Sequence, residues 1–354
     1  MSCGKKQNDA LDGYAAMSVT QLRQLVKEQY PYVKQVRLLN RDELCALLNK
    51  DCVGMGGLTN KANSCYLDSA LISLLFMNCP YIHNEILHKQ LNHQDPELQT
   101  CALRIQRMLV TIYDAIEKGK RGACSKLREA FELFDTMYAD KIGKIEKLDW
   151  RREQLEPADV FKFLIRVFQI GDDCEYEFKS YSVAKGHKTP LTDEIRKGTF
   201  ADCMIGIDVL SKDNFSDLSK YVPKHTERIR ILKRDVGDDG ILRKMIVKKY
   251  VKAPLFTVHV QRVMSGGKIQ TPIVPFPTLK LKNNENVLHL RAVIVHHGSS
   301  ADHGHYTSYL RCKQFWYHYD DLAFEKMVKI GSTKQLFLQN KNYVLRNCVN
   351  LIYF

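Results

Sequence analysis

With 354 residues, of which 45% are apolar and 26% charged, the chain has the length of one large domain or two smaller ones and enough apolar side chains for a core. This composition excludes a disordered or fibrous protein. The longest apolar run, Ala70 to Met77, contains Ser73 and is far shorter than the roughly 20 residues of a membrane-spanning helix. The N-terminus lacks the apolar region of a secretory signal. We therefore expect a soluble protein of the cytoplasm or nucleus, with no membrane partner.

The eleven cysteines include no CxxC pair, which is the spacing that structural zinc sites usually need. Their density is also far below that of a disulfide scaffold, and intracellular proteins keep their thiols reduced. We therefore expect reduced cysteines, no metal site and no cofactor.

Residues 1–16 are polar and are expected to form a flexible N-terminus. Residues 17–50 are expected to form a small helical module, with Ser18 capping a first helix that Pro31 ends, an extended stretch over 32–39, and a second helix over 41–48. This outline resembles helix-extension-helix modules of the SAP type, which often bind nucleic acid. The alternative is a plain helical hairpin packed on the main domain.

Beyond Gly54, Gly56 and Gly57, helical patterns come first and strands follow. Apolar periodicity predicts helices over residues 65–77, 97–118, 125–138 and 158–169. Strand patterns cover residues 254–262, 287–296, 305–311 and 315–319. Helices followed by antiparallel strands indicate an α+β fold.

The net charge of +13 is concentrated between Lys224 and Lys252, where ten Lys and Arg oppose four acids. The turn signal Gly237-Asp238-Asp239-Gly240 predicts a basic hairpin in this stretch. A basic surface can bind nucleic acid weakly or meet an acidic protein surface. A solvated hairpin face is the other interpretation.

Cys65 stands at the predicted start of an apolar helix, after Asn60-Lys61-Ala62-Asn63-Ser64. Unpaired amides and the positive end of the helix dipole stabilise a thiolate at such a position. Asn60 and Asn63 lie near enough in sequence to donate a hydrogen bond to an oxyanion. A cysteine at a helix start is, by itself, also compatible with a small buried side chain.

His305 follows Gly304 at a predicted strand start, and Asp320 ends the next strand. Antiparallel pairing of these strands brings Asp320 close to His305. A carboxylate there would hold the imidazole while the other ring nitrogen takes a proton from Cys65. The nearby histidines could instead suggest a metal, but this segment has no cysteine or acid at ligand spacing.

Two long motifs together resemble the ubiquitin-specific proteases. Gly57-Leu58-Thr59-Asn60-Lys61-Ala62-Asn63-Ser64-Cys65-Tyr66-Leu67-Asp68-Ser69 resembles the family's Cys box, and its second half is similar to the cylindromatosis-type branch. Gly304-His305-Tyr306-Thr307-Ser308-Tyr309, with Trp316-Tyr317-His318-Tyr319-Asp320-Asp321, resembles the His box. Shorter landmarks between and after them agree in order: Pro254–Arg262, Val287–Gly298 and Asn342–Leu345. The resemblance covers residues 57–354.

The resemblance implies a papain-like cysteine protease fold with a helical thumb, an antiparallel β palm and short, metal-free fingers. It also implies hydrolysis of the bond after the C-terminal Gly of ubiquitin through an acyl-enzyme, with ubiquitin or ubiquitinated proteins as partners. By the same resemblance Cys65 is the nucleophile, His305 the base, Asp320 the orienting acid and Asn60 the oxyanion donor. It assigns substrate contacts to Asp159, Tyr306, Asn63 and Asp321.

One departure concerns the substrate. Lys162 stands where the family usually has Glu, beside the matching acid Asp159. These acids normally meet the basic tail of ubiquitin, so a cation opposes that complementarity. Glu153 or Glu156 could hold the tail instead, the modifier could be a different ubiquitin-like protein, or Lys162 could point outward and touch nothing. A catalytically idle scaffold that binds ubiquitin or nucleic acid is the remaining alternative.

Overall fold

The computed structural model describes residues 14, 17–29, 33, 35–48, 52, 54–60, 63–142, 148–151, 155–184, 187–199, 204–208, 230–236, 242–251, 255–264, 267–279, 287–300, 303–325, 327–339 and 341–354. Between residues 171 and 251 we describe the backbone alone. No helix among these residues has both the length and the apolar character needed to cross a bilayer.

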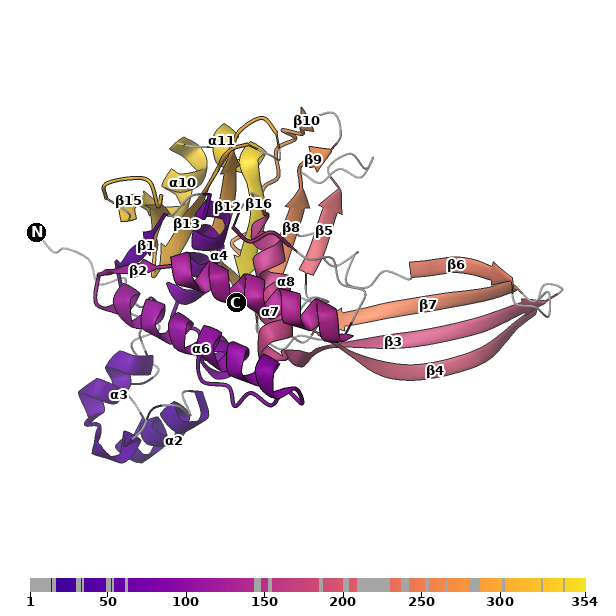
Figure 1. The fold of residues 1–354 in the computed structure, drawn as a ribbon, viewed down its shortest axis with the longest axis horizontal. Coiled ribbons are helices and arrows are strands. Elements are labelled where there is room, and N and C mark those ends of the chain that lie inside the picture. Colours follow the sequence, from indigo (N-terminus) through magenta and orange to yellow (C-terminus); the bar gives the residue numbers. More distant parts are fainter. Residues whose placement is uncertain are drawn as a thin grey trace, which may run out of the picture.

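Two N-terminal helices pack on each other around a small core of their own. Helix α2 spans Val19–Gln29 and helix α3 spans Arg41–Leu48, with the 3-10 turn η1 at Val36–Leu38 between them. Buried side chains from all three elements form the core: Leu22, Val26, Val36, Leu44 and Leu48. The turn corrects the predicted extended stretch, because Val36 turns inward to close this core. Figure 1 shows these helices below α6, at one end of the molecule.

The helical layer contains one fully buried helix and three that cover it. All eleven residues of α4 (Cys65–Leu75) are buried. Around it lie α6 (Pro96–Glu117), α7 (Ser125–Ile142) and α8 (Pro157–Phe168), with the short elements α5 (Pro80–Ile82) and η2 (His83–Leu87). Helix α6 starts where Asp95 accepts the amides of Glu97 and Leu98 at 2.9 and 3.0 Å, which is a typical N-cap. The four predicted helices of this layer are confirmed to within a few residues.

An eight-stranded sheet packs against these helices. Its order is β15-β14-β13-β12-β16-β8-β5, with β11 beside β12. The strands are β5 (Met204–Asp208), β8 (Phe256–Gln261), β11 (Thr278–Leu279), β12 (Leu288–His297), β13 (His305–Cys312), β14 (Phe315–Tyr319), β15 (Met327–Ser332) and β16 (Cys348–Tyr353). All neighbours pair antiparallel except β5 and β8, which run parallel. A layer of helices packed on a mostly antiparallel sheet confirms the α+β class.

Smaller elements complete the body of the molecule. Strand β1 (Gly57–Thr59) pairs parallel with β2 (Arg121–Ala123). Strands β9 (Val263–Met264) and β10 (Gly267–Lys268) form a two-residue ladder. Helices α10 (Thr333–Gln339) and α11 (Lys341–Asn347) connect β15 to β16.

A second sheet projects from the body as a long arm (Figure 1). Its order is β4-β3-β7-β6, from β3 (Gly171–Ala184), β4 (His187–Thr199), β6 (Arg230–Val236) and β7 (Leu242–Val251). The predicted hairpin is present as β6 and β7. The prediction of a short element is wrong, since β3 and β4 have 14 and 13 residues. The sequence has a strong turn signal at 237–240, between β6 and β7, and none of comparable strength between β3 and β4.

One disulfide contradicts the expectation of reduced cysteines. Cys52 and Cys312 are bonded across 260 residues of chain, with their Cα atoms 5.4 Å apart. The bond joins the segment before β1 to the last residue of β13. Nothing in the local sequence around either cysteine indicates this pairing, because only the fold brings them together.

Candidate active site

Cys65 is the first residue of α4, as its sequence context predicts. Ser64 precedes the helix, and Asn63 adopts a left-handed backbone with φ of 55°. The Cys65 side chain is 4% exposed, and its sulfur accepts backbone hydrogen bonds from Tyr306 and Tyr66. The helix start therefore lies against the beginning of β13, where His305 is the neighbour of Tyr306.

The thiol of Cys65 is not stabilised as a thiolate in this structure. Its pKa is raised to about 11, by burial first and then by the nearby carboxyl groups of Asp321 and Asp68. The two backbone amides lower the pKa but do not compensate for these effects. The expectation of a thiolate at the helix start is wrong for the free protein, because the loss of solvent outweighs the favourable amides.

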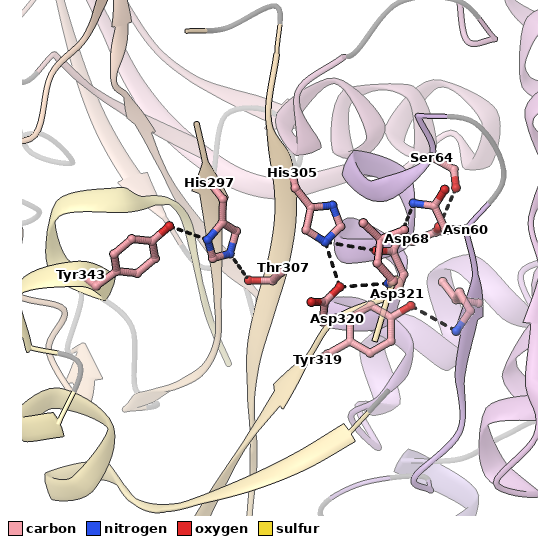
Figure 2. A network of polar contacts seen from close by, with 12 residues as sticks. Asn60, Ser64, Asp68, His297, His305, Thr307, Tyr319, Asp320, Asp321 and Tyr343 are labelled. Atoms are coloured by element: carbon pink, nitrogen blue, oxygen red, sulfur yellow. Dashed lines mark hydrogen bonds and ion pairs between the residues drawn. The ribbon is translucent and has the colours of Figure 1, made fainter. Parts of the chain in front are cut away.

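His305 and Asp320 form the pair that the strand pattern predicts. The register of β13 and β14 aligns Ser308 with Tyr319, so Asp320 follows β14 near the start of β13. The His305 Nε2 atom lies 2.8 Å from Asp320 Oδ1 (Figure 2). Burial raises the pKa of Asp320, but hydrogen bonds from His305 and from the Leu322 amide outweigh it and lower the pKa below its ordinary value. With Nε2 held by a carboxylate, Nδ1 is the ring nitrogen left to exchange a proton.

Gly304 is required directly before His305. A Cβ atom at this position would lie 2.3 Å from the carbonyl oxygen of His297 and 2.3 Å from Nε2 of His296. The first of these atoms belongs to the backbone and cannot move aside. The close approach fixes the start of β13 against β12, and with it the position of His305.

A second acid lies behind the imidazole. Asp321 is buried, and its Oδ1 lies 3.5 Å from His305 Nε2. Its Oδ2 accepts a hydrogen bond of 2.7 Å from the side-chain amide of Asn60. Asn60 follows β1, which is held in place because the Leu58 amide donates to the Tyr319 hydroxyl at 3.1 Å. In the free protein the Asn60 amide therefore points to an acid.

Two residues of this network were not predicted as site residues. The carboxyl of Asp68, on α4, contacts the Asp321 carboxyl and the Cys124 thiol. Asp68 also accepts a hydrogen bond of 2.6 Å from the Ser64 hydroxyl. A signal for Asp68 was present in the sequence, since an acid within an otherwise apolar helix needs a buried polar partner. Cys124 carried no such signal.

The other predicted substrate contacts are Tyr306, Asp159 and Asn63. Burial, and then the charges of Glu156, Cys65 and Asp159, raise the pKa of Tyr306, which places these groups around its side chain. Asn63 is exposed and makes no hydrogen bond within the described part of the chain. Glu153 lies outside the described residues.

Lys162 is exposed, but it does touch another residue. Its Nζ lies 3.2 Å from Asp159 Oδ1, one turn away on α8, with 59% of the lysine side chain exposed. Glu156 is also paired, since His259 Nε2 lies 3.3 Å from its Oε2. The interpretation that Lys162 contacts nothing is therefore wrong. Both acids beside Tyr306 already have a basic partner within the chain.

His305, Asp320 and Asp321 are also the described residues whose ligand atoms lie closely enough, within 4.8 Å of one another, to hold a metal ion. Two of these three side chains, His305 and Asp320, are already joined by a hydrogen bond of 2.8 Å. The described geometry is an imidazole hydrogen-bonded to a carboxylate, at the start of the strand that lies against Cys65.

Comparison with known proteins gives a family match over most of the chain. Residues 56–346 match the family described as ubiquitin carboxyl-terminal hydrolase. Among individual proteins, a ubiquitin carboxyl-terminal hydrolase 12 from Salmo salar is 25% identical to this chain, over 77% of this chain and 81% of the relative. The matched region includes Cys65, His305, Asp320 and Asp321.

Proposed function

We infer the function from one premise: the chain belongs to the ubiquitin carboxyl-terminal hydrolase family, and it is a cysteine-type deubiquitinase. The reaction is hydrolysis of the bond after the C-terminal Gly of ubiquitin, with ubiquitin or ubiquitinated proteins as partners. The observation that carries this proposal to individual residues is the juxtaposition of Cys65 with the start of β13, together with the His305–Asp320 hydrogen bond.

We propose that Cys65 is the nucleophile and His305 the base. His305 Nδ1 takes the thiol proton, and the thiolate attacks the carbonyl carbon of the terminal Gly to give a tetrahedral oxyanion. The imidazolium then gives its proton to the leaving amine, and a thioester remains on Cys65. His305 next takes a proton from a water molecule, whose oxygen attacks the thioester and releases the ubiquitin carboxylate and the Cys65 thiol. Asp320 keeps the proton on Nε2 and stabilises the imidazolium.

The role of Asn60 as the oxyanion donor requires a rearrangement. Its amide donates to Asp321 in the free protein, and one of its two N–H groups must face the substrate carbonyl during the reaction. The raised pKa of Cys65 also indicates that the site of the free protein is incomplete. We propose that substrate binding completes the site, since the free protein keeps a neutral thiol at Cys65 and directs the Asn60 amide to Asp321.

Finer assignments are proposals of the same kind. The helical layer corresponds to the family's thumb, the eight-stranded sheet to the palm and the four-stranded arm to the fingers. The likeness of the Cys box to the cylindromatosis-type branch supports a place in that branch. We place the protein in the cytoplasm or nucleus. We also propose that the module at residues 17–50 or the basic hairpin binds nucleic acid weakly, which deletion of residues 1–50 or a salt titration would test.

The experiment uses ubiquitin that carries a thiol-reactive electrophile at its C-terminus. We expect a covalent adduct with the wild-type protein and none with Cys65→Ala. The matched control is Cys45→Ala, because Cys45 is a free cysteine in α3 and is more exposed than Cys65. This control should react like the wild type. An adduct that persists in Cys65→Ala, or no adduct from folded wild-type protein, would contradict the proposal, and the second result would favour the scaffold.

A second candidate is a protease for another ubiquitin-like modifier. The observation that favours it is the internal pairing of Asp159 with Lys162, which leaves less acidic charge for the basic ubiquitin tail. The same electrophile attached to other modifiers separates the two candidates. A Cys65-dependent adduct with another modifier and none with ubiquitin would identify that modifier as the substrate and leave the proposed mechanism unchanged.

A further inference from the structure

Asp68 is an acid in a position where a carboxylate would be costly. Asp68 is 0% exposed and lies three residues after Cys65 on the fully buried α4. Within the described residues it forms no ion pair. Ser64 donates to it at 2.6 Å and the Cys124 thiol is the other neutral neighbour. An unpaired buried carboxylate costs several kcal/mol, so a neutral carboxyl is favoured there.

The carboxyl of Asp321 is the third neighbour of Asp68. Two carboxyl groups in contact share a proton, because two negative charges at that separation repel each other strongly. Their surroundings decide which of them carries it. Asp321 faces the Asn60 amide at 2.7 Å and His305 Nε2 at 3.5 Å, and both stabilise a negative charge. Asp68 faces a hydroxyl and a thiol, so the proton is assigned to Asp68. Its pKa is well above the ordinary value because of burial first, and of Asp321 as well.

We propose that Asp68 is a positioning residue of the hydrolysis: it carries the shared proton, donates it in a hydrogen bond to Asp321, and thereby holds Asp321 against His305 and Asn60. This inference rests on the proposed function, since it concerns the same site. Asp320 orients the imidazole from its partly exposed side, and the Asp68–Asp321 pair supports it from the buried side (Figure 2).

The proton on Asp68 also limits the negative charge beside the nucleophile. Asp321 and Asp68 both raise the pKa of the Cys65 thiol when they are charged. A pair that holds one proton has a single negative charge, which can stabilise the His305 imidazolium. A second negative charge would add little to the stabilisation of the imidazolium and would further oppose formation of the thiolate.

Two substitutions separate the role of the proton from the role of the volume. Asp68→Asn keeps the shape, an N–H that can donate to Asp321 and an oxygen that can accept from Ser64. Asp68→Leu keeps the branching at Cγ, with a larger side chain and no donor. We expect kcat/KM for a ubiquitin substrate within about threefold of the wild type for Asp68→Asn. For Asp68→Leu we expect kcat to fall at least tenfold with KM unchanged, and the acidic limb of the pH–kcat/KM curve to move to higher pH, because the pair that supports the His305 imidazole has lost its hydrogen-bond donor.

Two measurements need no substrate. The infrared spectrum should contain a protonated-carboxyl stretch that disappears in Asp68→Asn and persists in the control Asp135→Asn, since Asp135 is a buried acid whose partner is Arg166, at 2.7 Å. The pH dependence of Cys65 alkylation should be unchanged in Asp68→Asn. A loss of the stretch would support the proposal even if Asp68→Leu failed to fold.

Three results would overturn the proposal. The first is a wild-type infrared spectrum with no protonated-carboxyl stretch that Asp68→Asn removes. The second is a shift of the alkylation curve or of the acidic limb in Asp68→Asn, which would mean that the substitution removed a charge. The third is full activity in a folded Asp68→Leu. Failure of the ubiquitin adduct with an intact infrared result would contradict the proposed function alone, so the two failures are distinguishable.

Discussion

Arg262 and Asp321 are both buried charged residues in the same α+β body, but the groups that surround them differ in kind. Arg262 is 1% exposed and donates to the carbonyl oxygens of Ile269, Thr271, Leu345 and Cys348 at 2.6–3.0 Å. Asp321 is 2% exposed and contacts side chains, namely Asn60, His305 and Asp68.

The difference in partners indicates a difference in role. Carbonyl oxygens are fixed by the backbone, carry no exchangeable proton and hold Arg262 as a connection between the end of β8, the segment after β10 and the start of β16. Side-chain partners can exchange protons and can turn toward a substrate. We therefore expect changes at Arg262 to lower stability and changes at Asp321 to lower activity.

The largest effect is expected for Arg262→Met. It removes the donor to four carbonyl oxygens, two of them in buried hydrogen bonds, and we expect the free energy of unfolding to fall by about 3–5 kcal/mol. The stability of Arg262→Lys should lie between those of the wild type and Arg262→Met, because an ammonium group cannot reach all four acceptors. Denaturant unfolding measures both. An Arg262→Met protein with wild-type stability and reduced kcat/KM would break the comparison, since Arg262 would then act on the reaction.

Reduction of the Cys52–Cys312 disulfide should have the next largest effect. Cys312 ends β13, the strand that His305 begins, so the bond is remote from both buried charges. We expect a loss of about 2–4 kcal/mol of stability and an unchanged kcat below the unfolding temperature. Thermal unfolding with and without a reductant, with the Cys52→Ala/Cys312→Ala variant as a reference, measures it. A fall in kcat on reduction would show that β13 needs the bond to place His305.

A smaller and more specific effect concerns the thiol. The pKa of Cys65 is about 11, so alkylation of Cys65 by iodoacetamide should still rise with pH above pH 9. Asp321→Asn removes a negative charge that raises this pKa, and it should speed alkylation at pH 8 at least twofold while it slows hydrolysis of ubiquitin. Alkylation followed by mass spectrometry gives the rate at Cys65 alone. Slower alkylation in Asp321→Asn would mean that this acid promotes the thiolate.

The smallest effect is expected at the surface. Lys162→Gln removes an exposed ion pair one turn apart on α8, which is worth less than about 0.5 kcal/mol of stability. It frees Asp159, so KM for a ubiquitin substrate should fall two- to fivefold at low salt and less at high salt. An unchanged KM would indicate that Asp159 does not meet the substrate tail.

The sequence alone determined the local features of the site. Cys65 begins an apolar helix, and the Gly304-His305 strand pairs with a strand that ends at Asp320. Each of these features depends on residues within about twenty positions along the chain, so periodicity and turn signals are enough to predict them.

The tertiary structure decided the electrostatics and the long-range contacts. Asn60 meets Asp321, Asp68 contacts Asp321, and Cys52 bonds Cys312, each pair more than 250 residues apart. The pKa of Cys65 follows from burial, from Asp68 on the same helix and from Asp321, which the fold brings in from the segment after β14. Local pattern predicted a stabilised thiolate, because it includes the helix amides next to the cysteine but neither the loss of solvent nor charges brought in by the fold.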